Sequence, residues 1–343
     1  MKVDFADLYS TLRRVQATIA SNDSIEVYTF LCFRDGRVTS FDGTVGTITA
    51  SGLEKLGEFC VAGRKFCSII SAVCKQKGEL TFADDWLFIK ADNFRTKLPV
   101  YPAAEFPDIA PLNTTRKICE ATNVCEALRA ANTFVEKDDE KQQITGLGFS
   151  KDKIYSSDGK RIVQATLNVA VSTPFTISKP AADQIVSLGE PDYLFKCASN
   201  LGALYAETKT VMIARTPASE FPFDFAERVF ALKGDDTFEV PDEMRKAVDR
   251  VRSFSEDDEG VIFLRSDGYH LKISTAATET GEASDVIPLT SSVFNVKLKG
   301  SKLGTLLSKL KPTQADVTDL TRGDKRMIVF SGESFDVAFA AMV

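Results

Sequence analysis

The apolar positions of this chain follow a pattern that occurs three times. Apolar triplets at helical spacing stand at Leu8/Leu12/Val15, Val124/Leu128/Ala131 and Met244/Val248/Val251. After each triplet the chain alternates apolar and polar residues in short runs separated by turn residues, as half-buried strands do. The pattern predicts a unit of helix and strands that is repeated along the chain.

A second block of the chain supports the same repeat. Phe59-x-Val61 returns as Phe175-x-Ile177 and as Phe294-x-Val296, at spacings of about 115 to 120 residues. The turn Pro102-Ala-Ala-Glu-Phe-Pro107 returns as Pro217-Ala-Ser-Glu-Phe-Pro222. Phenylalanine is abundant here, so one match could arise by chance, but several features in one order favour duplication. We expect an α+β fold of three domains, residues 1–112, 113–232 and 233–343, each with two helices on antiparallel sheets.

Local patterns place the elements within each unit. The apolar periodicity predicts first helices over residues 4–19 and about 118–135, and a third that follows Pro241. The run IEVYTFLCF predicts a strand over residues 25–33. Second helices are expected after Phe59-x-Val61, from Lys179 and after Phe294-x-Val296.

Composition indicates an ordinary globular protein. The chain carries a net charge of −6, has 44% hydrophobic residues and contains no apolar run near the ~20 residues that span a bilayer. No secretory signal opens the chain, so we expect a cytoplasmic protein. The seven cysteines are odd in number and form no C-x-x-C pair, which predicts neither disulfides nor a zinc ribbon. Cys60, Cys67 and Cys74 are spaced as a stripe, but burial by packing is favoured over metal binding.

Motifs for catalysis are largely absent. His270 is the single histidine, and it stands beside a hairpin turn. Gly146-Leu-Gly148 resembles the start of a dinucleotide fingerprint but lacks the third glycine and the following helix. Acidic clusters at residues 136–140 and 256–259 are interpreted as solvated loops. An enzyme that uses these acidic loops remains a minor alternative, and no cofactor or metal is expected.

Basic residues gather on equivalent segments of the first and third units. Residues 60–77 and 294–311 contain lysines and arginines without any acid, although the chain as a whole is acidic. Such a surplus favours a surface that faces a polyanion, while a solvated helix face is the plain alternative. The middle unit weakens the case, because Lys179 is accompanied there by Asp183 and Glu190.

The chain resembles the bacterial-type DNA sliding clamps, the beta subunits of replicative DNA polymerase, as a divergent or phage-borne member. The resemblance is carried by these segments: Val61–Phe66, Arg95–Leu98, Pro102–Asp108, Ser157–Ile162, Glu220–Pro222 and Phe294–Val296. It implies a ring of two head-to-tail subunits that encircles duplex DNA without base preference and tethers a polymerase, after loading by a clamp loader. The implied DNA contacts are Arg13, Arg14, Arg64, Lys65, Lys75, Lys77, Lys137, Lys141, Lys179, Lys297, Lys299 and Lys302. The subunit contact is expected where residues 94–98 meet the sheet around residues 269–273.

The resemblance also implies a pocket for short partner peptides between the second and third domains. Its matching positions are Ile144, Ser157, Gly159, Lys160, Arg161, Ile162, Pro222, Arg228, Val229, Asn295, Val337, Phe339, Ala340, Ala341, Met342 and Val343. Lys160 stands where the family has histidine, and the ending Phe339–Val343 differs from the family's, so the preferred peptide is left open. The alternative reading is a clamp-fold adaptor or decoy that does not encircle DNA.

Overall fold

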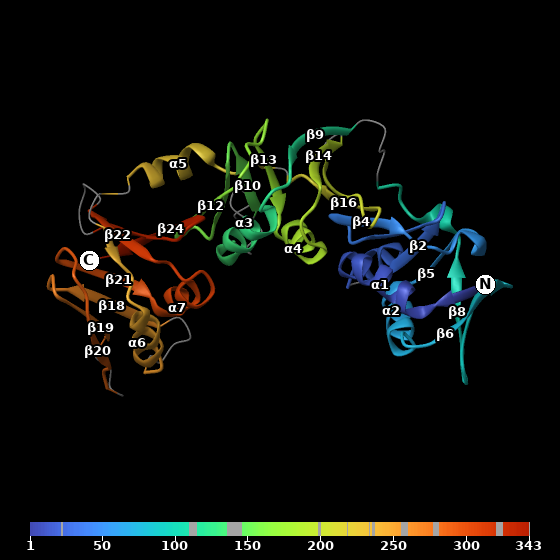
Figure 1. Ribbon diagram of the computed structural model, residues 1–343, viewed down its shortest axis with the longest axis horizontal. Helices are drawn as coiled ribbons and strands as arrows, with labels where there is room; N and C mark the ends of the chain where they lie inside the picture. The colour runs from blue at the N-terminus through green and yellow to red at the C-terminus, as the bar shows by residue number, and fades with distance from the viewer. Residues whose placement is uncertain are drawn as a thin grey trace. The chain divides into compact units, whose positions relative to one another are not determined.

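A computed structural model of the chain describes residues 1–21, 23–109, 115–135, 146–197, 200–217, 219–232, 234, 237–254, 260–276, 281–319 and 325–342. It contains two compact units (Figure 1). Unit 1 comprises Met1–Cys125, Val171–Thr173 and Ile177–Pro217, and unit 2 comprises Glu126–Ala170, Pro174–Thr176 and Ala218–Val343.

The order of elements repeats three times along the described chain. The first repeat contains β1 (Lys2–Asp4), α1 (Phe5–Val15), β2 (Phe30–Arg34), β3 (Arg37–Phe41), β4 (Val45–Ala50), β5 (Phe59–Ala62), α2 (Gly63–Ala72), β6 (Lys77–Ala83), β7 (Trp86–Ala91) and β8 (Phe94–Tyr101). The second contains β9 (Thr115–Glu120), α3 (Val124–Ala131), β10 (Gly146–Ser150), β11 (Lys153–Ser157), β12 (Arg161–Thr166), β13 (Phe175–Ser178), α4 (Lys179–Leu188), β14 (Tyr193–Cys197), β15 (Asn200–Tyr205) and β16 (Thr210–Arg215).

The third repeat follows the same order after one additional helix, α5 (Phe223–Ala231). It contains β17 (Thr237–Glu239), α6 (Asp242–Arg252), β18 (Val261–Ser266), β19 (His270–Thr275), β20 (Ser284–Pro288), β21 (Phe294–Lys299), α7 (Gly300–Lys309), β22 (Gln314–Asp319), β23 (Lys325–Ser331) and β24 (Phe335–Met342). Each repeat is therefore a strand, a helix, a three-stranded meander, a strand that runs straight into a second helix, and a second meander. The predicted α+β fold of repeated units with antiparallel sheets is confirmed.

Antiparallel pairing joins the strands of each unit. Unit 1 holds the order β1-β6-β7-β8-β5-β2-β3-β4-β16-β15-β14-β9. Unit 2 contains the order β10-β11-β12-β24-β21-β18-β19-β20, and β17, β22 and β23 extend its sheet from β24. The leading strand of each repeat pairs with the first strand of the second meander: β1 with β6, β9 with β14 and β17 with β22.

The core of unit 1 lies beneath α1 and α2. Leu8, Leu12 and Val15 of α1 are buried, so the predicted apolar triplet is the face that packs on the sheet. Phe33 stacks on Phe59 with ring centroids 4.9 Å apart, and Phe66 of α2 meets Phe33 edge to face at 5.8 Å. Aromatic pairs of this kind add to the stabilisation from buried apolar area.

Unit 2 repeats this arrangement with α6 and α7. Figure 1 shows the two helices beside each other against the sheet that holds β18 to β21, in agreement with their contacts. Met244 and Val248 of α6 and Leu303 and Leu306 of α7 are fully buried in one cluster with the strands. The same triplet that predicted a helix thus marks its buried face in both units.

Several predicted boundaries were wrong. The strand expected over residues 25–33 begins only at Phe30, because Asp23–Thr29 is wound into 3-10 turns. The helix expected over residues 118–135 begins at Val124, since β9 occupies Thr115–Glu120 and pairs with β14. The first helix ends at Val15 and continues as a 3-10 turn at Gln16–Thr18. The leading strands β1 and β17 have only three residues, which carry too little apolar pattern to be predicted, whereas β9 was included in the predicted helix.

The cysteines lie in the packed interior. Cys60 and Cys67 are buried, as the packing interpretation expects, whereas Cys74 is only partly buried. The other four cysteines are also buried, and all seven, which lie within the described residues, are free. Among the helices that the structure describes, none is long and apolar enough to cross a bilayer.

Candidate protein-binding pocket and nucleic-acid interface

A hollow of about 370 Å³ opens on unit 2 above the turn that joins β11 to β12. Gly159 adopts a φ of 82° in this turn, a left-handed conformation that favours glycine. The Asp158 carboxylate fixes the turn, since it accepts hydrogen bonds from the backbone N–H groups of Lys160 at 3.1 Å and Arg161 at 2.9 Å. β12 then pairs with β24, which places Ile162 opposite Ala338 on the pocket floor.

The helix α5 supplies the other wall of the pocket. Ala226 on the inner face of α5 is fully buried, and Val229 of α5 packs with the clusters that hold Ile162 and Met327. Phe225 and Leu232 line the hollow but remain 54% and 52% exposed, which is unusual for large apolar side chains. The pocket is therefore largely apolar and open to a ligand that can cover these side chains.

The absence of a side chain at Gly148 of β10 leaves room for the residues that lead into α5. A Cβ atom at Gly148 would lie 2.6 Å from both the Phe221 Cβ and the Phe223 Cε1, too close for any other residue. The Gly146-Leu-Gly148 fragment thus has a packing role at the base of α5, where the sequence pattern alone also resembled a nucleotide-binding motif.

Arg161 is a buried charge in the pocket wall. Its side chain is 5% exposed, and its Nη1 donates to the Asp158 carboxylate at 2.6 Å. The guanidinium also lies over the rings of Phe339 at 5.1 Å and Phe134 at 5.8 Å. Its Nε has no hydrogen-bond acceptor within the described part of the chain.

Most of the predicted pocket residues that the structure describes do meet in this hollow. Those that line it are Ser157, Gly159, Lys160, Arg161, Ile162, Pro222, Val229, Phe339 and Ala340. Arg228, Asn295, Val337 and Ala341 do not line it. Val337 and Ala341 are buried in the core, and Asn295 accepts a hydrogen bond from Arg265 at 3.2 Å. Ile144 and Val343 lie outside the described residues, and so does the side chain of Met342.

Sequence reasoning missed five residues of the lining. They are Phe221, Phe225, Leu232, Met327 and Ala338. The spacing of Phe225, Val229 and Leu232 is that of one helical face, so the segment carries a helix signal that the repeat pattern obscured. Met327 and Ala338 gave no signal, because they lie on β23 and β24 like any other strand residue.

The basic candidates of unit 1 lie on neighbouring helices. Arg13 and Arg14 are in the last turn of α1, and Arg64 and Lys65 open α2, which contacts α1. Gln184 of α4 donates to the Arg14 carbonyl at 2.9 Å, so α4 joins the same group. The Arg64 guanidinium donates to the Ile19 and Ala20 carbonyls, which ties this side chain to the end of the first helical segment.

The other basic candidates of unit 1 differ in setting. Lys75 and Lys77 lie beyond α2, and Lys77 is 3.8 Å from Asp4. Lys179 opens α4 and pairs with Asp183 at 3.2 Å. Lys137 and Lys141 lie outside the described residues.

In unit 2 the basic candidates lie on β21 and α7 and do not line the hollow. Lys297 and Lys299 are on β21, and Lys302 follows in the first turn of α7. Partial desolvation lowers the pKa of the Lys299 ammonium, and the nearby positive charges of Lys160, Arg161 and Lys302 lower it further. Lys160, expected in the pocket, and Lys299, expected at DNA, are thus neighbours.

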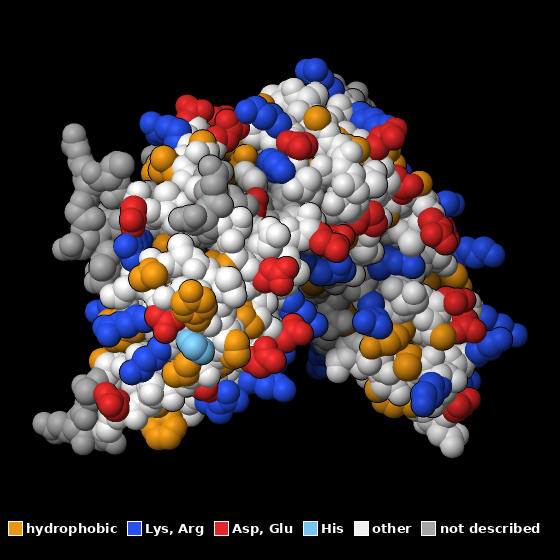
Figure 2. Space-filling model, turned by 60° about the vertical axis from the view of Figure 1, so that its left-hand side comes forward, with side chains coloured by type: hydrophobic (Ala, Val, Ile, Leu, Met, Phe, Trp, Pro, Cys, Tyr) orange, Lys and Arg blue, Asp and Glu red, His pale blue; other side chains and the backbone are white. Residues whose placement is uncertain are grey.

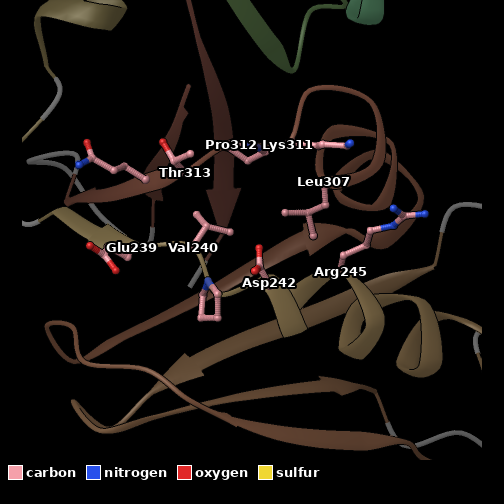
Figure 3. A pocket seen from close by; sticks show the side chains of 10 residues that line it. Glu239, Val240, Asp242, Arg245, Leu307, Lys311, Pro312 and Thr313 are labelled. Carbon is pink, nitrogen blue, oxygen red and sulfur yellow. The ribbon is translucent and has the colours of Figure 1, made fainter. Parts of the chain in front are cut away.

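A second hollow of about 660 Å³ lies elsewhere on unit 2, between the start of α6 and the segment after α7 (Figure 3). Asp242 and Leu307 point into it, whereas Glu239, Arg245 and Lys311 stand around its rim. The lining contains both acidic and basic side chains, so the surface of this hollow is neither uniformly negative nor uniformly positive. Among the described residues, no three His, Cys, Asp or Glu side chains come together as a metal site would require.

Each unit has a strand with an unpaired side. β8 pairs with β7 along its length but with β5 only at Val100 and Tyr101, which leaves residues 94–98 as an edge. In unit 2 one edge strand is β20, which pairs with β19 on one side only. Residues 269–273, around which the subunit contact is expected, include the start of β19, the strand next to β20, and the contact stays a prediction. Hydrophobic side chains lie exposed near the single histidine (Figure 2). Tyr269, which precedes His270 in the chain, is 75% exposed, and Val286 is 56% exposed on β20, the strand that pairs with β19.

The fold is that of the sliding clamps that serve bacterial DNA polymerase III. The clamp of Bartonella birtlesii superimposes with a TM-score of 0.85 at 16% identity and covers 100% of this chain and 99% of its own. The beta subunit of Thermotoga maritima gives 0.84 at 14% identity, with coverage of 100% and 98%. A Helicobacter pylori clamp bound to a DNA ligase peptide gives 0.81 at 16% identity, with coverage of 100% and 99%.

Sequence comparison leads to the same proteins. The beta sliding clamp of Helicobacter pylori strain J99 is 25% identical over 222 residues, which is 59% of this chain and 59% of the relative. The match thus spans less than two thirds of the curated relative's length. No family model matches the chain. The resemblance to sliding clamps that the sequence motifs indicated is confirmed at the level of the fold.

Proposed function

We propose that this protein is a DNA sliding clamp, a non-enzymatic processivity factor that encircles duplex DNA and tethers the replicative polymerase. The observation that carries the proposal is the pocket. An apolar hollow with exposed Phe225 and Leu232 lies where the family resemblance assigns partner binding, within a chain that has the clamp fold from end to end.

The ring is proposed to form from two copies that join head to tail. The open side of β8 at residues 94–98 would pair with β20 of the partner, which satisfies backbone groups that are unpaired in one copy. Val286 on β20, and Phe94 on β8 at 40% exposed, provide apolar surface for the contact.

DNA contact is assigned to basic side chains of the helices. Arg13, Arg14 and Lys65 lie on α1 and α2. Such side chains bind phosphates without reading bases, and this suits a ring that must slide. The ring would stay on DNA because it encloses the duplex, so weak contacts with the phosphates would be sufficient.

The pocket would receive short peptides from the polymerase, from the clamp loader that opens the ring, and from other DNA-processing enzymes. A Helicobacter pylori clamp bound to a DNA ligase peptide supports this assignment. Acting on bacterial or phage DNA, the protein would work in the cytoplasm at the nucleoid.

Loading on circular DNA tests the proposal. The protein is assembled with a cognate loader on nicked circular DNA, separated by gel filtration, and the circle is then linearised. A clamp stays with the circle at high salt and leaves after linearisation. A protein that binds DNA only by charge would dissociate in salt whether the DNA is circular or linear, and this result would refute the proposal.

The variant V286E tests the proposed subunit contact. Val286 is exposed in a single copy, so the substitution leaves the core intact while it places a charge on the proposed contact. V286E should elute as one subunit and should fail to remain on circular DNA.

A further inference from the structure

Two cysteines face each other in the sheet of unit 1. Cys32 on β2 lies directly opposite Cys60 on β5, and these two antiparallel strands are neighbours in the sheet. Side chains at directly opposed positions point to the same face of a sheet, with Cβ atoms about 4.5–5.5 Å apart. A disulfide joins residues whose Cα atoms are about 4.4–6.8 Å apart, so this position can hold one with little movement of the backbone.

The cysteine pair lies on the face of the sheet that α1 and α2 do not cover. Both thiols are buried in a small cluster with Phe30, Ala103 and Phe106. The segment after β8 closes over this cluster, and the Cys32 Sγ lies 4.0 Å from the carbonyl oxygen of Ala103. The two side chains are therefore held in one apolar cluster and point to the same side of the sheet.

The other cysteines are placed differently. Cys67 belongs to the cluster beneath α2, on the opposite face of the sheet. Cys74 is partly buried and lies beyond the end of α2. The regular spacing of Cys60, Cys67 and Cys74 along the chain therefore does not bring these three together, whereas the strand register brings Cys60 to Cys32.

The surroundings distinguish the two members of the pair. The hydrogen bond with the Cys60 thiol lowers the pKa of Cys32, burial opposes this shift, and the positive charge of Arg34 lowers the pKa further. The same hydrogen bond and burial raise the pKa of Cys60. A hollow of about 120 Å³ beside Cys32, lined also by Arg34 and Arg37, gives a small uncharged oxidant access to this sulfur. Cys32 is therefore the member that reacts first.

We propose that Cys32 and Cys60 form a redox modification site, which hydrogen peroxide converts to a disulfide between β2 and β5. The Cys32 thiolate attacks one peroxide oxygen, so that an S–O bond forms, the O–O bond breaks, and the departing hydroxide takes up the proton that Cys32 released. The Cys60 sulfur then displaces hydroxide from the Cys32 sulfenic acid, and this hydroxide takes up the proton of Cys60. The two thiols lose two electrons and two protons, and one peroxide becomes two waters.

Peptide mapping under non-reducing conditions tests the proposal. The reduced full-length protein is treated with rising concentrations of hydrogen peroxide until the partly buried Cys74 is oxidised, which shows that the oxidant is active. The remaining thiols are then alkylated after unfolding. Trypsin separates Cys32 from Cys60, because Arg34, Arg37 and Lys55 lie between them. We expect a linked pair of peptides that is lighter by two hydrogen masses than the reduced peptides and that dithiothreitol separates.

Alanine variants assign the two roles and keep these buried positions apolar. In C60A, oxidation should stop at a sulfenic acid on Cys32, which dimedone traps, and in C32A the Cys60 thiol should stay reduced. C67A is the matched control, since Cys67 is also buried but lies on the other face of the sheet, and it should still form the linked pair. Oxidation should slow hydrogen exchange in β2 and β5 roughly 10-fold or more, because the cross-link restricts the unfolded chain, and C32A should not show this slowing.

Two results would overturn the inference. If Cys74 is oxidised while Cys32 and Cys60 remain thiols, the pair serves packing alone. If either cysteine is instead linked to a different one, the strand register does not select the partner. Both results are obtained with the unaltered chain, so they hold even where a variant does not fold. The readout involves neither DNA nor a partner peptide, so it is independent of the function proposed above.

Discussion

The Asp158→Ala variant probes the buried ion pair in the pocket wall. Asp158 accepts two backbone hydrogen bonds through Oδ1 and one from Arg161 Nη1 through Oδ2. Loss of the turn contacts should cost about 1–2 kcal/mol. Loss of the carboxylate also leaves the guanidinium, which is 5% exposed, without its counter-ion, and this should cost about 3–5 kcal/mol more.

The repeat provides a matched control in Asp42→Ala. Asp42 occupies the equivalent turn between β3 and β4, where its Oδ1 accepts from the backbone N–H of Thr44 at 2.8 Å and of Val45 at 2.7 Å. No arginine ion pair with Asp42 occurs among the described residues. Asp42 Oδ1 also accepts from Thr44 Oγ1 at 2.9 Å, so D42A should lose the turn contacts and this one side-chain bond. The additional loss in D158A is then a lower bound on the contribution of the ion pair.

Hydrogen exchange followed by mass spectrometry suits this comparison, because it reports each turn separately in a chain with two compact units. Exchange in β12 and β24 should rise far more in D158A than exchange in β3 and β4 rises in D42A. The double variant D158A/R161M, which replaces the stranded charge by an apolar side chain, should recover part of the protection. Equal losses in D158A and D42A would refute the claim that Arg161 depends on this carboxylate.

Three further predictions follow from particular contacts. Gly148→Ala should destabilise unit 2 by about 1–3 kcal/mol and weaken peptide binding, because the added Cβ would displace Phe221. As a control, Gly46→Ala on β4 should destabilise unit 1 without changing the affinity for peptides. Burial raises the pKa of Tyr155 from 10.0 to about 12, so unit 2 should lose stability as pH rises from about 10 to about 12, and Tyr155→Phe should remove this part of the loss in alkaline denaturation monitored by circular dichroism. Val286→Glu should give the mass of a single subunit in analytical ultracentrifugation, and an unchanged dimer would exclude β20 from the subunit contact.

The helices were predictable because their apolar spacing carries most of the signal. The triplet Leu8, Leu12 and Val15 is buried as expected, and so is its counterpart on α6. The helix after each F-x-V segment also begins where expected. The strand continues directly into the helix, so the short motif in the strand also marks the start of the helix. The prediction of a strand over residues 25–29 was wrong. β-branched and aromatic residues there favour a strand, but the chain forms 3-10 turns before it enters the sheet.

The site was predictable only in part. The turn Ser157–Ile162 could be located from its motif, and residues of this turn line the apolar hollow of unit 2. The neighbourhood of Lys160 and Lys299 could not be foreseen, because it depends on β24 lying between strands that are far apart in sequence. The assignment of Lys299 to DNA came from its position in a basic segment, which carries no information about the direction of a side chain.

The helix α5 sets unit 2 apart from an otherwise regular triplication. Phe106 and Phe221 occupy equivalent turns after the first and second repeats, and both are buried. After Phe221 the chain forms α5, whereas the turn with Phe106 contains a 3-10 segment at Ala103–Glu105. Among the described residues, this short helix therefore gives unit 2 an apolar hollow that the first repeat does not share. If the hollow binds partner peptides as proposed, partners that use it would exclude one another, and the order in which they act would depend on which one occupies it.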